Sequence, residues 1–542
     1  MLNTAFVVWR TELGEDRVLD TAQAMKQYGD STLGGEPSTI RGALLPESVA
    51  HVISIMKIAA EYKTPLYPIS TGKNWGYGSA RPVMPSIIVD LSGMNRILSI
   101  SEELGLVTVE PGVTSGQLQA QLEKKGIPFL APISGAGKRC SIIGNLLEHG
   151  RGSNAFVDRF ASLAGIEAVL ADGTLYQSSS GGTSSVHGFH KWGTGPYLDG
   201  IFGQSNMVIV VNATIKLAPV PEYTQGFLLC VKDDRSLSEL INAARTALQK
   251  LGSTLPSIII QNAQRTLTRT TPYSKEHVDV SGTLSDSFVK NSLKSLGLTQ
   301  WTVLGVLQGE RGMVRAAHGV VKDIFRTFAV RAFFFDEKSL EELKFLNRNF
   351  LLPRRLKISL AVAPMLHSFL AHSLGKGVGK IETARRKPFP YWKSASASSV
   401  VAPVISRTSD YDLDPHGGLL FFSAVLPACG ANVEPFVLAA ESICRKNGLE
   451  PILGLLNFSD TSLFVSLPLL FDKANAKETS AVQNCYEELR AELLKCGGYI
   501  HRANINTMKM SANQDSTFWQ VVGKIKKTLD PLNIISPGRY NS

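Results

Sequence analysis

The stretch Pro68-Ile-Ser-Thr-Gly-Lys-Asn-Trp-Gly-Tyr-Gly78 is the most informative part of this chain. It follows a short apolar run at residues 64–67 and places three glycines among Ser, Thr and Asn side chains. Glycine adopts positive φ and lets the backbone approach a ligand closely. Consecutive backbone N–H groups in such a loop form a concave anion site that suits a pyrophosphate. The same pattern is typical of an ordinary turn after a strand, so the loop alone supports both interpretations.

The composition is that of a folded chain with more than one subdomain. Its 542 residues are too many for one simple core, and contents of 44% hydrophobic and 19% charged residues exclude a disordered protein. The net charge is +10, but Lys and Arg are dispersed, and the densest run is Arg385-Arg386-Lys387. We therefore expect a solvated basic surface that favours anionic ligands, and no nucleic-acid partner.

The six cysteines indicate reduced thiols. They form no CxxC pair and no metal-ligand spacing, so no metal site is predicted, and reduced thiols fit a cytoplasmic protein. The N-terminal residues lack a basic segment followed by a long apolar run, and no window is long and apolar enough to span a membrane. We therefore expect no signal peptide and no membrane partner.

The hydrophobic pattern predicts an α+β fold. Apolar residues recur with helical spacing at 46–62 and 115–125, and short apolar runs predict strands at 65–70, 86–91, 106–110 and 207–217. The Asp172-Gly173 turn predicts a hairpin over 166–177. No GxGxxG motif opens a helix after the first strand, so a Rossmann nucleotide site is not supported.

A second region follows a Pro-rich hinge at 218–221 and alternates strands with helices. Strands are predicted at 226–231, 301–307, 419–426 and 463–470, and helices at 237–251, 314–326 and 433–446. Residues 381–415 are rich in Arg, Lys, Ser and Pro and predict a loop. A last helix is predicted at 518–529, before a turn-rich terminus.

Six further segments carry a family resemblance together with residues 68–78, in this order. They are Met94-Asn-Arg-Ile-Leu98, Val109-Glu-Pro-Gly-Val-Thr114, Ser141-Ile-Ile-Gly-Asn145, Gly195-Pro-Tyr-Leu-Asp-Gly-Ile-Phe-Gly-Gln-Ser-Asn-Met207, Leu420-Phe-Phe-Ser423 and Asp530-Pro-Leu-Asn-Ile-Ile-Ser-Pro-Gly-Arg539. Each is modest, but their ordered combination is specific. Through them the chain resembles the vanillyl-alcohol oxidase and p-cresol methylhydroxylase (PCMH-type) family of FAD-linked oxidases.

The resemblance implies a PCMH-type FAD-binding domain of two α+β subdomains over residues 1–220, with its core at 40–220. It also implies an α/β substrate cap domain over the flavin at 221–495, and a C-terminal segment at 496–542 that returns to the FAD domain. The residues that it assigns to cofactor binding are Ser70, Thr71, Gly72, Lys73, Asn74, Ser141, Gly144, Asn145, Ile209 and Arg539. Arg539 would stabilise negative charge at flavin N1–O2, and a solvated terminal residue is its alternative interpretation.

The residues favour FAD that is bound without a covalent link. Many members of the family attach the flavin through a histidine just before Leu-Phe-Phe-Ser, where this chain has Leu419. Related enzymes use a histidine in the first Gly-rich loop, where this chain has Asn74. His416 and Cys140 are the two candidate attachment residues, and their alternatives are a loop histidine and a buried inert thiol.

Three positions bear on the substrate. The phenol-oxidising members hold a phenolate with two tyrosines and an arginine; Tyr77 and Arg502 match one tyrosine and the arginine, and His501 replaces the other tyrosine. Such a set binds a phenolate or equally a carboxylate. The family's aspartate near flavin N5 has no match at 132–140, so His501 is the candidate base. Simple packing of Tyr77 and a surface position for His501 are the alternatives.

The resemblance thus implies an FAD-dependent oxidase or dehydrogenase that transfers a hydride from a small phenolic or related aromatic substrate to flavin N5. The bond oxidised would be a benzylic C–H, an alcohol or an amine, and a role in natural-product biosynthesis is consistent with the departures. The alternatives are oxidation of a non-aromatic alcohol, sugar or hydroxy acid, and a non-catalytic family member. The electron acceptor, O2 or another, is left open. Relatives are often dimers, so a homodimer is one expectation.

Overall fold

The chain divides into two compact units. A computed structural model describes residues 2–540 apart from 35–38, 136, 153–155, 179–187, 233–235, 272, 274, 349–361, 375–416 and 509–515. The first unit comprises Met1–Gly152, Asp158–Pro219 and Arg502–Ser542, and the second comprises Ser153–Val157 and Val220–His501. The loop predicted at 381–415 and His416 lie outside the described residues.

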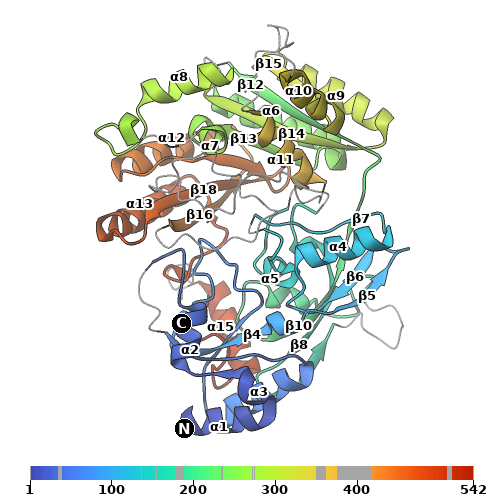
Figure 1. The fold of residues 1–542 in the computed structure, drawn as a ribbon, viewed down its shortest axis with the longest axis vertical. Coiled ribbons are helices and arrows are strands. Elements are labelled where there is room, and N and C mark those ends of the chain that lie inside the picture. Colours follow the sequence, from blue (N-terminus) through green and yellow to red (C-terminus); the bar gives the residue numbers. More distant parts are fainter. Residues whose placement is uncertain are drawn as a thin grey trace. The chain divides into compact units, whose positions relative to one another are not determined.

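A four-stranded sheet begins the first unit (Figure 1), in the order β1-β2-β4-β3. Its strands are β1 (Val18–Leu19), β2 (Ile40–Leu44), β3 (Leu66–Ile69) and β4 (Ser86–Asp90), and the helices of this part are α1 (Leu2–Leu13), α2 (Thr21–Tyr28) and α3 (Val49–Glu61). β2, β4 and β3 are parallel, as the crossover through α3 requires. Trp9 of α1 and Met56 of α3 are fully buried in one core with Ile87 and Val89 of β4, which fixes the end of β3 where the Gly-rich loop begins.

A five-stranded antiparallel sheet forms the other part of this unit, in the order β5-β6-β10-β8-β9. Its strands are β5 (Ile97–Ser101), β6 (Leu106–Val109), β8 (Leu163–Val169), β9 (Leu175–Gln177) and β10 (Ile209–Lys216), and β7 (Phe129–Leu130) pairs with β11 (Ala218–Pro219) apart from it. The helices α4 (Ser115–Lys125), α5 (Ile142–Leu147) and α15 (Thr517–Leu529) pack on its core. The pairing of β8 with β9 confirms the predicted hairpin.

The C-terminal tail lies along β3. The amide of Leu66 donates to the carbonyl of Ile534, and the amide of Ser536 donates to the carbonyl of Leu66, both at 2.7 Å. Behind the tail, the buried ammonium of Lys526 pairs with Asp530 and donates to the carbonyls of Asn206 and Ile535. These contacts hold the tail in place and fix the backbone that carries Arg539.

The second unit is built on an eight-stranded antiparallel sheet (Figure 1), in the order β15-β12-β14-β13-β17-β18-β16-β19. The strands are β12 (Tyr223–Val231), β13 (Ser257–Asn262), β14 (Trp301–Gly309), β15 (Ala329–Phe335), β16 (Gly417–Pro427), β17 (Gly454–Asn457), β18 (Ser462–Asp472) and β19 (Tyr499–Ile500). The sheet alternates in burial between its faces. Leu228 and Leu304 face one core, whereas Phe227 packs on Phe334, which stacks under His318 on the other side.

Helices cover both faces of this sheet. Core residues of α7 (Ala263–Thr270), α8 (Asp286–Leu296), α10 (Glu337–Arg348) and α11 (Ala363–Ser373) share one cluster with Leu228 and Leu304. The helices in contact in a row on the other side are α9 (Arg311–Phe325), α6 (Leu237–Leu251), α12 (Gly430–Lys446) and α13 (Ala476–Lys495). The second unit is therefore an α/β layer structure, as predicted.

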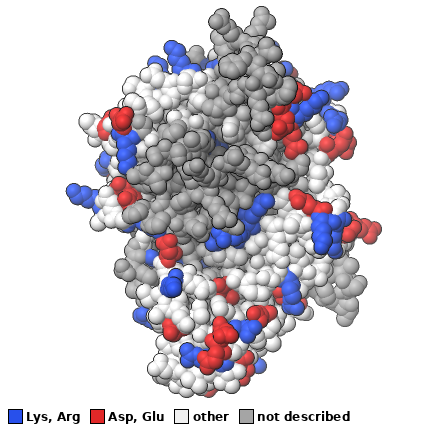
Figure 2. All heavy atoms as spheres, in the orientation of Figure 1, with Lys and Arg blue, Asp and Glu red and all other residues white. Residues whose placement is uncertain are grey.

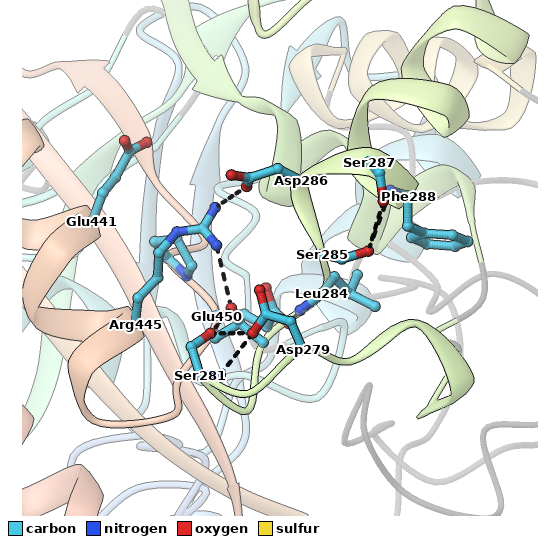
Figure 3. Close-up of polar contacts among 12 residues, drawn as sticks. Asp279, Ser281, Leu284, Ser285, Asp286, Ser287, Phe288, Glu441, Arg445 and Glu450 are labelled. Carbon is cyan, nitrogen blue, oxygen red and sulfur yellow. Dashed lines mark hydrogen bonds and ion pairs between the residues drawn. The ribbon is translucent and has the colours of Figure 1, made fainter.

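Polar contacts hold the start of α8 against the end of α12 (Figure 3). Arg445 donates to Asp286 Oδ1 at 2.9 Å and to Thr283 Oγ1 at 3.3 Å. Glu450 Oε1 accepts from the amide of Leu284 at 2.7 Å. Burial raises the pKa of the neighbouring Glu441 carboxyl above its ordinary value, although Asn262 and Arg445 partly oppose the shift.

Charge is spread over the surface. On the face drawn in Figure 2, Lys and Arg side chains alternate with Asp and Glu over the described residues. This distribution agrees with a solvated surface rather than a continuous basic tract. Within the described part of the chain, no helix is long and apolar enough to cross a membrane.

Candidate functional site

The Gly-rich loop leaves β3 in a tight series of turns. Gly72, Gly76 and Gly78 have φ values of 64°, 80° and 128°, the region that favours glycine. The Asn74 carbonyl accepts from the amides of Tyr77 (3.2 Å) and Ser79 (3.0 Å). The amides of Thr71, Gly72 and Asn74 have no hydrogen-bond partner among the described residues. The loop thus offers unused backbone donors, which is the cradle that a pyrophosphate needs.

The beginning of α5 is tied to this loop. The Ser141 amide donates to Thr71 Oγ1 at 3.1 Å, and Ser141 Oγ caps α5 by accepting from the Gly144 amide at 2.9 Å. A Cβ atom on Gly144 would lie 2.4 Å from Ser70 Oγ, so this close approach requires glycine. Asn145 follows in the same helix, half-buried like the loop. The structure therefore brings Ser70–Asn74 together with Ser141, Gly144 and Asn145.

Ile209 lies in the core of the first unit, in one hydrophobic cluster with Leu66 of β3 and Val89 of β4. It begins β10 and is 1% exposed in the core beneath the sheet. A side chain so buried packs against the core, so any contribution of Ile209 to cofactor binding would come from its backbone. Its role stays a prediction.

Tyr77 and Arg502 form a stacked pair. The Arg502 Cζ atom lies 4.2 Å from the centroid of the Tyr77 ring, within the range of a cation–π contact. Arg502 Nη2 also donates to Asn74 Oδ1 at 2.5 Å. The backbone supports the pair, because the Ile505 amide donates to the Tyr77 carbonyl at 3.0 Å. Two of the three predicted catalytic residues thus meet at the end of the Gly-rich loop.

Arg539 joins the same cluster through Glu148. The Glu148 carboxylate pairs with Arg539 through Oε1, and its Oε2 lies 3.6 Å from Arg502 Nη2. All three side chains are nearly buried, with exposed fractions of 15%, 12% and 13% for Glu148, Arg539 and Arg502. Arg539 is therefore not a solvated terminal residue. We name Glu148, Arg502 and Arg539 the arginine–glutamate triad.

Two tyrosines complete the surroundings of the triad. Arg539 Nη1 lies 3.4 Å from the Tyr67 hydroxyl, and its guanidinium lies 5.6 Å from the centroid of the Tyr540 ring. Burial raises the pKa of the Tyr540 hydroxyl, an effect that the two arginines partly oppose. Within the described residues, the Tyr540 hydroxyl and the Nε atoms of both arginines are buried without a hydrogen-bond partner. These groups can donate hydrogen bonds to an anionic ligand.

Sequence reasoning missed Glu148, Tyr67 and Tyr540. A signal for Glu148 existed, because it follows α5 directly and is an acid three residues after Asn145. The tyrosines had weaker signals, since Tyr67 reads as a strand residue and Tyr540 as part of the terminal turn. Their grouping follows from the position of the tail along β3.

His501 belongs to the second unit. Its ring packs on the rings of Phe458 and Phe464, with centroids 4.8 and 5.7 Å apart, and its amide donates to the Ser423 carbonyl at 2.9 Å. The half-buried aromatic setting agrees better with a positioned side chain than with a surface-strand residue. The assignment of His501 as base stays a prediction.

Cys140 lies one residue before the cap of α5. It is 7% exposed, and burial raises the pKa of its thiol, against a hydrogen bond with Ser134 and the positive charges of Arg502, Lys73 and Arg159. A thiol with a raised pKa is a weak nucleophile at neutral pH. Leu419, at the position of the family's attachment histidine, is 3% exposed on β16.

The chain is similar to known flavoproteins over its whole length. Residues 40–179 match the family model described as FAD binding domain. The chain is 28% identical to 1'-carboxy-chondrochloren decarboxylase of Chondromyces crocatus, covering 100% of this chain and 97% of the relative. It is 26% identical to the 4-cresol dehydrogenase [hydroxylating] flavoprotein subunit of Pseudomonas putida, covering 99% and 95%. A solved structure of p-cresol methylhydroxylase with substrate bound superposes with a TM-score of 0.81 at 25% identity, covering 99% and 96%.

These matches confirm the predicted fold class and the predicted cofactor. The similarity runs over the whole chain rather than one domain. The chain is therefore an FAD-dependent oxidoreductase with a PCMH-type fold.

Proposed function

We propose that the enzyme oxidises a small aromatic substrate, whose phenolate oxygen it binds with Tyr77 and Arg502. The observation that carries the proposal is the stacked pair itself, 4.2 Å from Cζ to ring centroid, at the end of the loop that would hold FAD. The names of two relatives, a 4-cresol dehydrogenase and a p-cresol methylhydroxylase, support a phenolic substrate.

Arg502 and Tyr77 would act on the substrate oxygen. The Arg502 charge favours the ionised phenol, because an adjacent cation lowers the pKa of an acid. Tyr77 donates a hydrogen bond to the same oxygen, and both contacts orient the ring. Ionisation makes the benzylic carbon a better hydride donor, and FAD, when bound, accepts that hydride at N5. His501 is our candidate for the group that takes up the substrate proton.

The remaining site residues would hold FAD without a covalent bond. The amides of Thr71, Gly72 and Asn74 suit the pyrophosphate, and Ser141, Gly144 and Asn145 would line the approach beside them. Arg539 would face the pyrimidine edge of the flavin. Leu419 at the attachment position and the buried thiol of Cys140 support a non-covalent cofactor.

A second candidate keeps the site and changes the substrate to an aromatic compound with a carboxylate, which the enzyme would release as CO2. The whole-length relative named as a decarboxylase favours this candidate, and an arginine fork binds a carboxylate as well as a phenolate. Such a substrate would fit a role in natural-product tailoring.

Anaerobic reduction of the flavin tests these functions. The purified protein is mixed with 4-alkylphenols, with 4-hydroxyphenyl compounds that carry a carboxylate, and with aliphatic hydroxy acids, and the bleaching of the flavin is followed. Reduction by 4-alkylphenols supports the first candidate. Reduction by the carboxylates with release of CO2 supports the second, and reduction by hydroxy acids alone contradicts both. Admission of O2 then distinguishes an oxidase, which forms H2O2, from a dehydrogenase.

A further inference from the structure

We propose that Glu148 is a positioning residue that sets the positive charge presented to the flavin and the substrate by Arg502 and Arg539. The inference rests on the proposed function, because that function places one arginine at the substrate and the other at the flavin. It adds a third residue, which lies between the two arginines.

Glu148 bridges the two arginines. Glu148 uses both oxygens, Oε1 toward Arg539 and Oε2 toward Arg502 at 3.6 Å. Its backbone is fixed, because it ends α5 with its amide donating to the Gly144 carbonyl at 3.3 Å. The helix that carries the cofactor-binding Gly144 therefore also sets the distance between the two arginines.

Glu148 offsets one of the two positive charges of the arginines. Within the described residues, Glu148 is the single carboxylate paired with Arg502 or Arg539. The triad thus carries a net charge of +1 in a nearly buried place, where charges interact more strongly than in water. The other described polar partners are neutral, namely Asn74 and Tyr67.

The proposed ligands of the two arginines are anions. A phenolate brings one negative charge, and a two-electron reduced flavin that keeps N1 deprotonated also brings one. A net charge of +1 stabilises either anion, but a net charge of +2 would bind them more tightly and would slow release. Glu148 would therefore moderate the reduction potential and the affinity for phenolates together.

The test is the substitution E148Q, which keeps the shape and removes the charge. We expect the midpoint potential of the bound FAD to rise by about 30 mV or more, which corresponds to a tenfold change for a two-electron couple. We also expect 4-nitrophenol, whose colour reports its ionisation, to bind at least tenfold more tightly as the phenolate. Wild-type values for both measurements would overturn the proposal.

Two variants separate charge from structure. E148D keeps the charge on a shorter side chain, so it should keep the wild-type midpoint potential even where turnover falls. Equal shifts of the midpoint potential in E148D and E148Q would mean a merely structural role and would overturn the proposal. E47Q makes the same change in the exposed Glu47–Arg17 pair and should change neither measurement. The midpoint potential is measured without a substrate. If no phenol reduces the flavin, the proposed function is contradicted, but the potentials of the variants still test the role of Glu148.

Discussion

The guanidinium of Arg502 lies over the ring of Tyr77, although hundreds of residues separate them in the chain. The pair is held from behind by the Ile505 amide and the Tyr77 carbonyl, so the stack does not depend on a ligand. An arginine fixed in this way can present the edge of its planar guanidinium group to the substrate.

Replacement of Arg502 by lysine should therefore damage catalysis and spare the cofactor. Lysine keeps the charge but loses the planar fork and the stacking. We expect R502K to slow flavin reduction by a phenolic substrate by about 100-fold or more, the usual effect of losing one positioned donor. Stopped-flow bleaching measures the rate, and R490K, in the Arg490–Glu487 pair on α13, is the matched control. An unchanged rate in R502K would remove Arg502 from the substrate site.

A methyl group on Gly144 should weaken FAD binding. The added Cβ would lie 2.4 Å from Ser70 Oγ, and overpacking of this kind costs about 1–3 kcal/mol. G144A should therefore bind FAD about tenfold more weakly, measured by titration of flavin fluorescence. The control G319A places its methyl group in open space on α9, where it should stabilise the helix by about 0.5–1 kcal/mol. Equal FAD affinity in G144A and the wild type would mean that the loop and α5 do not enclose the cofactor.

The flavin should leave the protein on acid precipitation. The buried Cys140 thiol has a raised pKa, so it is a weak nucleophile toward the flavin ring. We expect yellow supernatants from the wild type, C140S and H416A alike. A yellow pellet from the wild type that turns colourless in one variant would identify that residue as the attachment point.

Glu441 should make stability depend on pH. Burial raises the pKa of its carboxyl in the folded state, so the folded protein binds more protons between the ordinary and the raised value. The free energy of unfolding therefore falls as pH rises through that window. E441Q does not titrate and keeps an acceptor for Asn262, so its stability relative to the wild type should increase from acid to neutral pH. Urea unfolding across this range measures the difference, and a constant difference would contradict the raised pKa.

The sequence predicted elements with strong periodicity and clear ends. Helices at 115–125 and 237–251 have these bounds in the structure, because Gly126 ends the first in the left-handed region and apolar residues recur every turn in the second. No element was predicted before residue 46, although Ala5, Trp9 and Leu13 of α1 are buried at four-residue spacing. The six-residue α5 is too short for a periodic signal.

Part of the site was also predictable from local sequence patterns. The glycines, Tyr77, Arg502 and Arg539 stand in motifs that can be recognised locally. The pairing of Glu148 with two arginines depends on chain segments that are remote in sequence, and no local pattern of Leu146-Leu147-Glu148 indicates it. Contacts of this kind follow from the packing of the tail on β3.

That packing has a consequence for synthesis of the enzyme. The Gly-rich loop and Glu148 are synthesised well before Arg502 and Arg539, and the Leu66 amide gains its acceptor, the Ile534 carbonyl, only after the tail has been made. A nascent or prematurely terminated chain that lacks the tail would therefore lack both arginines of the arginine–glutamate triad. Flavin loading would then follow synthesis of the tail, and the yellow colour would report that Arg502 and Arg539 had been made.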